Sequence, residues 1–400
     1  MNPLMLSVIA VAIVFHAVPT AAAEVESPRL ALARAAARLW SQQGEDGGWH
    51  SGQYAVMRSG QALTPYVLHA LLAVPEEIAP RPAEGVDRAL DFIRRHVDEA
   101  GALGRTDADV LEYPAYSTSY AILCLLAVDD PGDEELLAKM TRWLAGAQFD
   151  EAEEFSPANF AYGGWGFDVA KGPGDPGHMD LAHTRRALAA LAAAAEGPAG
   201  VRAELTSRYS ARAEVFLGVV QRYNSPFLMM TRPQPALPAG EGVSASPFDG
   251  GFYFSPTVLA ANKGRVGDDP APHWRSYATA TCDGILALIA AGVARDDERL
   301  AGAESWLREH SNLDYPQGIP TDYPEPWGDA VKFYHYSVRA EAYRALDWPE
   351  TERRQLAELV AAQQRLDGAF RNEASSLMKE DDPLLCTALA VVALANSLAP

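Results

Sequence analysis

The stretch Gln43-Gly44-Glu45-Asp46-Gly47-Gly48-Trp49 returns near the end of the chain as Gln364-Arg365-Leu366-Asp367-Gly368-Ala369-Phe370. Both stretches read Gln-x-x-Asp-Gly-x-aromatic. Asp-Gly favours a tight turn, and Gly ends helices in a left-handed conformation. Gly163–Phe167 and Asp249–Phe252 vary the same turn after longer insertions. A turn that recurs along the chain predicts a repeat protein, with each repeat built from helices joined by this connector.

Two classes of predicted helix alternate around these turns. The first class is amphipathic and carries an aromatic residue or Leu near its C-terminal end: Ala31–Gln43, Gly85–His96, Glu134–Gln148, Ser207–Gln221, Asp297–His310 and Glu352–Gln364. The second class is more apolar: Thr64–Val74, Ala115–Val128, Asp180–Ala194, Ser276–Ala291, Ala330–Leu346 and Pro383–Leu398. Amphipathic helices lie at the surface, and helices apolar on most faces are buried. The sequence therefore predicts an all-α (α/α)6 toroid, in which six inner helices lie within six outer helices.

The charge balance excludes two classes of partner. The 400 residues include 53 acidic and 33 basic side chains, which gives a net charge of -20. Such a surface repels nucleic acid and anionic lipid. The three cysteines, Cys124, Cys282 and Cys386, cannot form a disulfide framework. We expect them to be buried on inner helices as small apolar residues.

The N-terminus is typical of a secretory signal peptide. Residues 3–23 contain no Asp, Glu, Lys or Arg, and Ala21-Ala22-Ala23 precede Glu24. We predict a signal peptide over residues 1–23 and one domain over residues 24–400, exported to the periplasm or secreted. No Lys or Arg precedes the apolar run, so an uncleaved N-terminal anchor is the alternative. No later segment is long and apolar enough to span a membrane, so we expect no membrane span in the mature chain.

Two connectors are long, Gln148–Met179 and Tyr223–His273. Both join a predicted outer helix to the next inner helix, so both are expected at the same end of the toroid. Loops of this length inside a compact domain are usually functional. They are placed to line or cover the mouth of a central cavity.

The repeated turns, together with Phe248–Phe254 and Ser276–Thr281, resemble the prenyltransferase and squalene-cyclase repeat superfamily over residues 28–398. That superfamily includes triterpene cyclases, protein prenyltransferase β-subunits and exported bacterial proteins. The resemblance implies a terpenoid cyclase-like α/α toroid, and it does not by itself imply a reaction.

The resemblance also places the cyclase motif Asp-x-Asp-Asp-Thr on Asp180–Thr184. In such cyclases the middle Asp protonates an alkene. Here Ala182 stands at the place of that proton donor, and His183 takes the last acidic position. A methyl group donates no proton, so we predict no cyclisation of squalene.

The zinc site of the prenyltransferases is also unsupported. In that family an Asp and a Cys two residues apart bind zinc together with a His on the next inner helix. The alignment puts Ala278 and Ala280 at the first two places, and Cys282 and Asp283 are adjacent, so they point about 100° apart on a helix. We therefore predict no metal and no cofactor.

Polar residues on the inner helices are the candidate site. Asp180 and His183 lie three residues apart on one helical face, which suits an acid–base pair, and they are the candidate catalytic residues. The candidate ligand-binding residues share a place near the same end of the toroid: Tyr113, Tyr116, Trp165, Arg185, Tyr277, Asp283, Tyr334, His335 and Tyr336. Each also has a structural interpretation: Asp180 as a helix cap, the turn aromatics as wedges between repeats, and His335 as a core residue.

Three functions fit these observations. The first is an exported protein that binds an apolar terpenoid or lipid-like ligand in the central cavity, with catalysis left open. The second is an exported carbohydrate-active enzyme, a glycosidase or lyase, which uses paired carboxylates or a Tyr, His and Arg set in an open cleft. The third is a non-catalytic interaction scaffold. The nature of the ring interior distinguishes the three.

Overall fold

The structure is a computed structural model, and it describes residues 27–399 except 108, 206–207, 222–248 and 267–272. The predicted signal peptide, the start of the predicted helix at Ser207 and much of the Tyr223–His273 connector lie outside the described residues. No helix in the part of the chain described here has both the length and the hydropathy needed to cross a bilayer.

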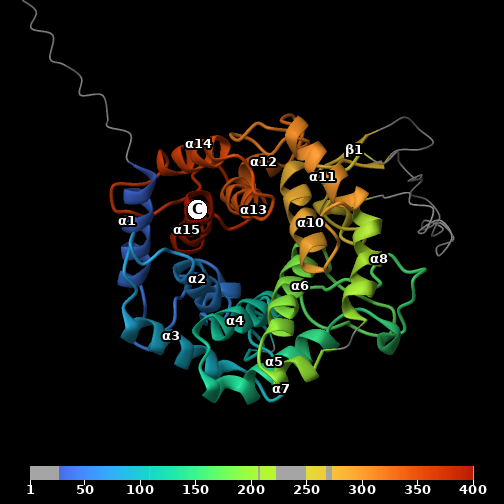
Figure 1. Ribbon diagram of the computed structural model, residues 1–400, viewed down its shortest axis with the longest axis horizontal. Coiled ribbons are helices and arrows are strands. Elements are labelled where there is room, and N and C mark those ends of the chain that lie inside the picture. The colour runs from blue at the N-terminus through green and yellow to red at the C-terminus, as the bar shows by residue number, and fades with distance from the viewer. Residues whose placement is uncertain (1–26, 108, 206–207, 222–248, 267–272, 400) are drawn as a thin grey trace, which may run out of the picture.

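The twelve predicted helices are present, and they form a closed double ring (Figure 1). The outer helices are α1 Pro28–Ser41, α3 Ala83–His96, α5 Glu134–Gly146, α8 Tyr209–Gln221, α11 Glu298–Glu309 and α14 Glu350–Ala361. The inner helices are α2 Leu63–Leu72, α4 Pro114–Val128, α6 Leu181–Glu196, α10 Ala278–Ala290, α13 Lys332–Ala345 and α15 Pro383–Leu398. Each inner helix packs on the next in this order, and α15 packs on α2. The predicted all-α toroid is therefore confirmed.

The ring closes where the two ends of the described chain meet. Helix α1 packs against both α14 and α15. Gln364 Nε2 donates to Ala31 O at 2.8 Å, and Arg34 Nη2 donates to Leu366 O at 2.6 Å. The first and last repeats thus make the same kind of contact that joins other neighbouring repeats.

The recurring turn explains this regularity. Its glycine has positive φ, 90° at Gly47 and 84° at Gly163, and a Cβ on Gly163 would lie 1.9 Å from Arg212 O. The glutamine before the turn donates from one Nε2 to the turn and to the next outer helix: Gln43 reaches Gly47 O at 3.0 Å and Gly85 O at 2.8 Å. One side chain therefore satisfies a carbonyl of the turn and a carbonyl of the next outer helix.

The aromatic after the turn is a wedge between repeats, as its structural interpretation predicted. Trp49 and Trp165 are fully buried, and their Nε1 atoms donate to the carbonyls of Leu39 and Leu144 at the ends of α1 and α5. The backbone N–H of Trp165 donates to Thr184 Oγ1 on the following inner helix at 3.0 Å. The same bond to an inner-helix Thr recurs at Trp49, Leu103, Phe252 and Phe370.

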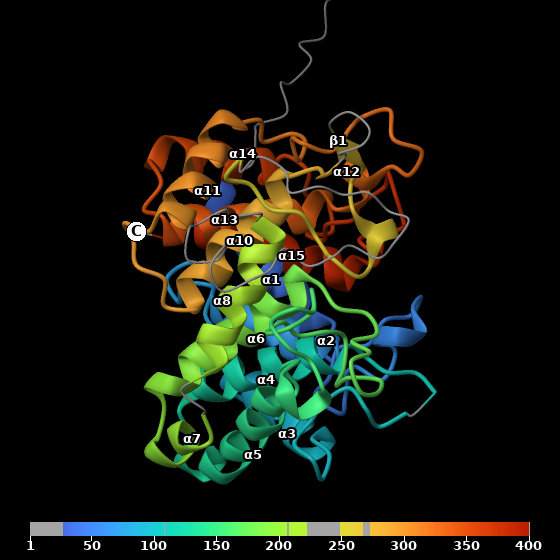
Figure 2. The same cartoon turned by 90° about the vertical axis from the view of Figure 1, so that its right-hand side faces the viewer.

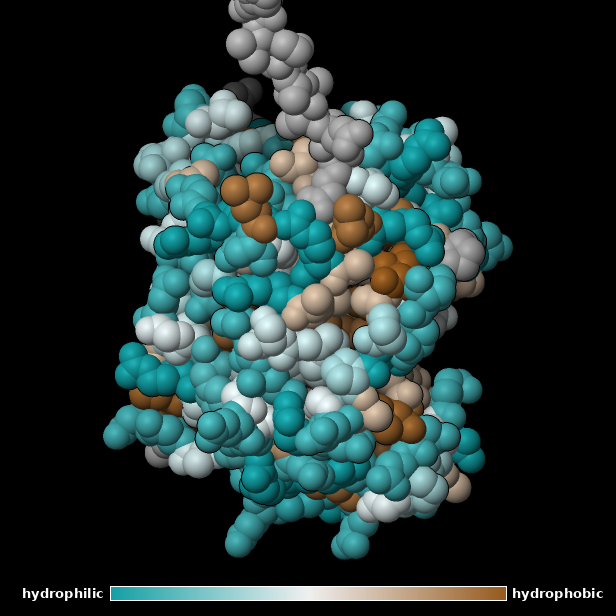
Figure 3. Space-filling model, turned by 90° about the vertical axis from the view of Figure 1, so that its left-hand side faces the viewer, coloured by the Kyte–Doolittle hydropathy of each residue, from teal (hydrophilic) through white to brown (hydrophobic). Residues whose placement is uncertain are grey.

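Several short elements lie outside the predicted pattern. They are the helices α7 Ala199–Ala203 and α12 Trp327–Ala330, the antiparallel pair β1 Arg265–Val266 and β2 His273–Trp274, and four 3-10 turns at Ala55–Met57, Pro131–Asp133, Glu151–Glu153 and Leu259–Ala261. Figure 2 shows β1 and the described parts of the long connectors at one end of the ring. The face on the side of α1 is mostly hydrophilic, apart from a band of hydrophobic side chains across its middle (Figure 3).

Candidate functional site

Asp180 precedes the first residue of α6 and lies at the centre of a small polar cluster. The cluster is at the end of the ring where the long connectors enter the inner helices. Its Oδ1 accepts the backbone N–H of His183 at 2.9 Å, which makes it the N-cap of the helix. Its Oδ2 faces two imidazoles, His183 Nδ1 at 2.9 Å and His178 Nε2 at 3.1 Å. The helix cap and the contact with His183 were alternatives in the sequence. Here one oxygen of Asp180 makes the cap and the other makes the contact.

These partners determine the charge of Asp180. Burial alone would raise its pKa, but the positive charge and hydrogen bonds of His183 and His178 outweigh burial and hold the pKa well below its ordinary value of 3.8. The hydrogen bond to Asp180 in turn raises the pKa of His178. Asp180 is consequently a carboxylate at neutral pH and acts as an acceptor, not as a proton donor.

Aromatic rings and one buried amine surround this cluster. The ring of Tyr116 meets that of His183 edge-on at 4.5 Å between centroids, and Tyr113 packs on Phe167 at 4.9 Å. Tyr113 adopts a left-handed conformation with φ 49°, immediately before α4. The described end of the second long connector covers the start of α6, because Leu181 N donates to Phe254 O at 3.0 Å. The described part of this connector thus contacts the start of α6.

Lys263 lies on that same connector, inside a group of aromatic rings. Its Nζ lies 3.6 Å from the ring centroid of Trp327, 5.4 Å from that of Phe254 and 5.5 Å from that of Tyr277. Burial lowers its pKa to about 7, and the negative charge of Asp180 partly offsets this effect. A buried amine that is about half charged near pH 7 therefore lies close enough to Asp180 to feel its charge.

A second polar cluster crosses the ring interior. Arg185 and Arg186 on α6 both face Glu341 on α13, at 2.7 Å and 3.8 Å. Helices α6 and α13 are separated by α10 in the ring, so these ion pairs pass through the interior. The Arg186 guanidinium also lies over the rings of Tyr120 and Tyr334, at 5.5 Å and 5.8 Å from their centroids.

Asp283 on α10 belongs to this second cluster, and its electrostatics differ from those of Asp180. Tyr334 Oη donates to its Oδ2 at 2.9 Å, while its Oδ1 has no hydrogen-bond partner within the described part of the chain. Burial raises its pKa to about 7, although the Arg186 charge and the Tyr334 hydrogen bond work in the opposite direction. Asp283 is therefore about half protonated near pH 7 and largely protonated below that pH, and its protonated form can donate a hydrogen bond.

Aromatic side chains line the interior around these charges. Tyr66 and His69 on α2 both pack against Tyr120, with ring centroids 4.9 Å and 5.0 Å away. His69, Tyr116 and Tyr334 stay partly accessible, and the Glu341 side chain keeps 18% of its surface exposed. The interior thus combines aromatic faces with a few polar groups.

Not every residue predicted for the site reaches this interior. Asp180, His183, Tyr113, Tyr116, Arg185, Tyr277, Asp283 and Tyr334 lie at the mouth or in the interior. Trp165 is instead the fully buried wedge described above. His335 is fully buried between α10 and α13, where its Nδ1 lies 3.2 Å from Thr279 Oγ1, and Tyr336 contacts Gln363 near the outer helix α14. These three offer a ligand almost no surface. His335 and Tyr336 differ from their neighbour Tyr334 because adjacent positions on a helix point to different sides.

Sequence reasoning missed four residues of the site: His178, Lys263, Arg186 and Glu341. The spacing His-x-Asp-x-x-His over residues 178–183 was a readable signal for His178. Arg186 and Glu341 carried no such signal, since their contact joins helices about 150 residues apart, as the sequence numbering shows. Cys124, Cys282 and Cys386 are buried and unbridged.

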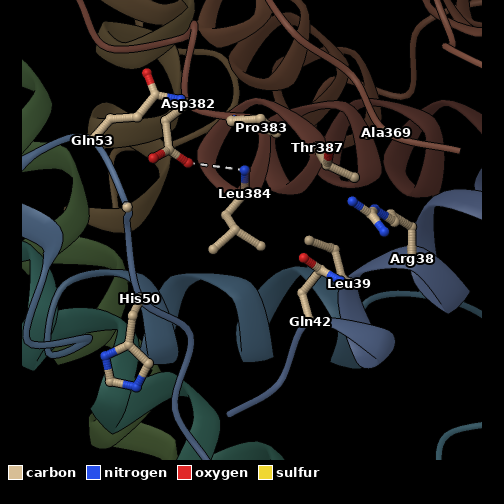
Figure 4. Close-up of a pocket in the computed structure, with 11 residues that line it drawn as sticks. Arg38, Leu39, Gln42, His50, Gln53, Ala369, Asp382, Pro383, Leu384 and Thr387 are labelled. Carbon is tan, nitrogen blue, oxygen red and sulfur yellow. Dashed lines mark hydrogen bonds between the residues drawn. The ribbon is translucent and has the colours of Figure 1, made fainter. Parts of the chain in front are cut away.

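A separate pocket of about 220 Å³ lies at the seam between the first and last repeats. It is lined from α1, from the turn after it and from the start of α15, and the Leu384 side chain points into it (Figure 4). Asp382 beside it is the N-cap of α15 and accepts from Leu384 N at 2.9 Å. This pocket lies between an outer and an inner helix, apart from the clusters described above.

Comparison with solved structures finds the same fold in a terpene cyclase and in a second protein. The type II terpene cyclase MstE from Scytonema, in complex with its substrate geranylgeranyl dihydroxybenzoate, superposes with a TM-score of 0.52 at 15% identity, over 92% of this chain and 98% of the other. A protein from Actinoplanes gives a TM-score of 0.54 at 16% identity, over 93% and 100% of the two chains. No protein-family profile and no curated protein sequence matches the chain. At this identity the likeness establishes the fold, and the chain has the terpenoid cyclase-like α/α fold that its repeats predicted.

Proposed function

We propose that this protein binds an apolar ligand of isoprenoid type in the ring interior, and that it does so outside the cytoplasm, after export. The observation that carries the proposal is the lining of the interior, where tyrosine rings from α2 and α4 pack on one another and Tyr334 of α13 donates to Asp283, an acid whose pKa is raised to about 7. Aromatic faces suit the unsaturated, branched chain of an isoprenoid. A neutral carboxyl donates a hydrogen bond to a single oxygen function on such a chain without a charge to desolvate.

Solved structures that share this fold support an isoprenoid as the class of ligand. MstE from Scytonema is described in complex with a geranylgeranyl-bearing substrate and, in another structure, with the product merosterolic acid A. The proposal carries over the class of ligand and not the reaction. Asp180, at the start of the motif segment, is ionised, and Ala182 stands at the place of the donor.

In its glycosidase form, the carbohydrate alternative needs two free carboxylates in an open cleft. The interior holds Asp283 and Glu341, but Glu341 Oε1 is in contact with Arg185 Nη2 at 2.7 Å. One of the two carboxylates is therefore committed to an ion pair, and the aromatic lining favours the isoprenoid ligand.

Isothermal titration calorimetry with geranylgeranyl dihydroxybenzoate tests the proposal. The wild-type chain is expected to bind the probe, and Tyr334→Ala to bind it about tenfold more weakly, because one aromatic face of the interior is lost. Tyr209→Ala is the matched control, since Tyr209 lies at the start of the outer helix α8 and should leave the affinity unchanged.

Failure of the wild type to bind, or equal affinities for wild type and Tyr334→Ala, would count against the proposal. The cellular part is tested separately, by fractionating cells that express the full chain and locating the mature protein. Retention in the cytoplasm with residues 1–23 intact would contradict export.

A further inference from the structure

Three side chains in the cluster at the start of α6 bring possible metal-ligand atoms close together, and none of the three has a part in the proposed isoprenoid binding. His178, Asp180 and His183 each offer one ligand atom, and these atoms lie within 4.8 Å of one another. Two imidazole nitrogens and one carboxylate oxygen are the donor set of mononuclear sites for divalent transition metals, including catalytic zinc sites. We propose that His178, Asp180 and His183 form a binding site for a divalent transition metal of the Zn²⁺ class.

The distances fit this assignment. Around a tetrahedral zinc ion with bonds of 2.0–2.1 Å, neighbouring ligand atoms lie about 3.3 Å apart. Here Asp180 Oδ2 lies 2.9 Å from His183 Nδ1 and 3.1 Å from His178 Nε2. Small side-chain rotations that lengthen these two contacts by a few tenths of an ångström admit the ion.

The backbone holds all three ligands in place. Asp180 Oδ1 accepts the N–H of His183, so the other carboxylate oxygen is fixed toward the imidazoles. His178 lies beside a short bridge between Gly166 and Met179, and its carbonyl accepts the N–H of Phe167 at 2.8 Å. Such support of a metal-binding carboxylate by a further hydrogen bond is a regular feature of metal sites.

Access also agrees with a metal. The His178 side chain keeps 48% of its surface exposed, while Asp180 and His183 are buried, so the ion has a path from one side. Three protein ligands leave at least one coordination position open for water or another ligand.

This assignment differs from the zinc pattern excluded from the sequence. That pattern required an Asp, a Cys and a His on two inner helices, whereas the present ligands belong to one connector and the first turn of one inner helix. The inference is independent of the proposed function, because it requires no isoprenoid ligand.

Titration of the full chain with Co²⁺ and Zn²⁺ tests the site, with protein that carries no polyhistidine tag and has been stripped with a chelator. We expect one Zn²⁺ per chain by elemental analysis and d–d absorption on addition of Co²⁺. His178→Ala and His183→Ala should each weaken binding by at least about tenfold, the effect that loss of even an outer partner has. Asp180→Asn should weaken binding while it preserves the helix cap, since Asn caps helices about as well as Asp.

The control is His50→Ala, which removes a histidine–aspartate contact outside the proposed metal site, between His50 Nε2 and Asp46 Oδ1 at 3.1 Å. It should leave Zn²⁺ affinity unchanged. Circular dichroism and thermal unfolding show whether each variant is folded. Absence of stoichiometric metal binding by the wild type, or unchanged affinity in folded His178→Ala and His183→Ala, overturns the proposal.

Discussion

Asp180 and Asp283 lie on or next to neighbouring inner helices and are almost equally buried, with 1% and 3% of their surface exposed, yet they differ in charge. Asp180 receives a backbone N–H and faces two imidazoles, so its pKa is lowered. Asp283 receives the hydroxyl of Tyr334, and burial raises its pKa to about 7. Burial therefore does not decide whether a carboxyl in this ring is charged; the donors that reach it do. One aspartate is a strong acid that has lost its proton, and the other holds a proton but is a weak acid.

The largest change in the free energy of unfolding is expected for Glu341→Ala, and this variant tests whether the ring interior is poorly solvated. Glu341→Ala leaves Arg185 and Arg186 without their common partner. Removing one member of a buried ion pair typically costs about 3–5 kcal/mol, so the free energy of unfolding measured with urea should fall by that amount. Glu204→Ala is the control, since Arg142 beside it is 62% exposed, and the loss should stay below about 1 kcal/mol. Equal losses in the two variants would show that the interior is as well solvated as the surface.

Asp283→Asn should make the protein clearly more stable at pH 8 and stabilise it by a smaller amount at pH 5. The folded pKa is raised to about 7, so the carboxyl disfavours folding progressively as pH rises from about 4 to about 7, and by a constant amount well above pH 7. The difference between this pKa and the ordinary value of 3.8 corresponds to a gain in the free energy of unfolding of at most about 4 kcal/mol. Urea unfolding at both pH values measures the gain. Asp180→Asn is the contrast, because Asp180 is ionised throughout this range and should show no such gain; a gain in both variants would remove the distinction between the two aspartates.

Asp180→Ala should cost about 1–2 kcal/mol at neutral pH, because α6 loses its N-cap. Asp180→Asn keeps the capping oxygen and should cost less. The folded pKa of Asp180 lies below 3.8, so its charge contributes fully at neutral pH and this contribution is lost as pH falls below about 4. Thermal unfolding of both variants at pH 7 and pH 3 checks these signs. A loss from Asp180→Ala that is larger at pH 3 than at pH 7 would contradict the lowered pKa.

The smallest expected effect is none at all: incubation of the full chain with squalene should yield no cyclised product. Alkene protonation needs a group that is both a strong acid and protonated. Asp180 fails the second condition and Asp283 the first, while Ala182 supplies no acid. Extraction and mass spectrometry decide the outcome, and hopene-like products would refute this account of both aspartates.

The fold was predictable because its signals are local. The Gln-x-x-Asp-Gly-x-aromatic turn works within one connector and the next outer helix, as the two hydrogen bonds of Gln43 Nε2 show. The Asp180–His183 contact was predictable for the same reason, since it lies within one helical turn. The helix limits differ from the predicted ones by a few residues, as at α5, which ends at Gly146 where the pattern extended to Gln148. Gln148 instead donates to Gly163 O and Tyr209 O.

The interior was less predictable, because its contacts depend on how helices rotate in the ring. His335 and Tyr336 are neighbours of Tyr334, yet Tyr334 alone of the three contacts Asp283 and Arg186. Inner helices are apolar on most faces, so the pattern of residues does not show which face points inward. The Arg186–Glu341 contact and the position of Lys263 beside Trp327 arise from packing of distant segments.

The contact of α1 with α14 and α15 affects how the chain reaches its native state. In an open stack of repeats, each new repeat adds to a surface that already exists, and folding proceeds from one end. In this ring the surface of the first repeat that faces the last repeat is buried only when the last repeat packs on it. This burial requires pairing between segments more than 300 residues apart, as the hydrogen bond from Gln364 to Ala31 shows. Such long-range pairing slows folding and leaves hydrophobic surface exposed meanwhile. A ribosome-bound chain in which α15 has not yet been made therefore carries an unpaired first repeat, and the complete ring forms only after α15 is available.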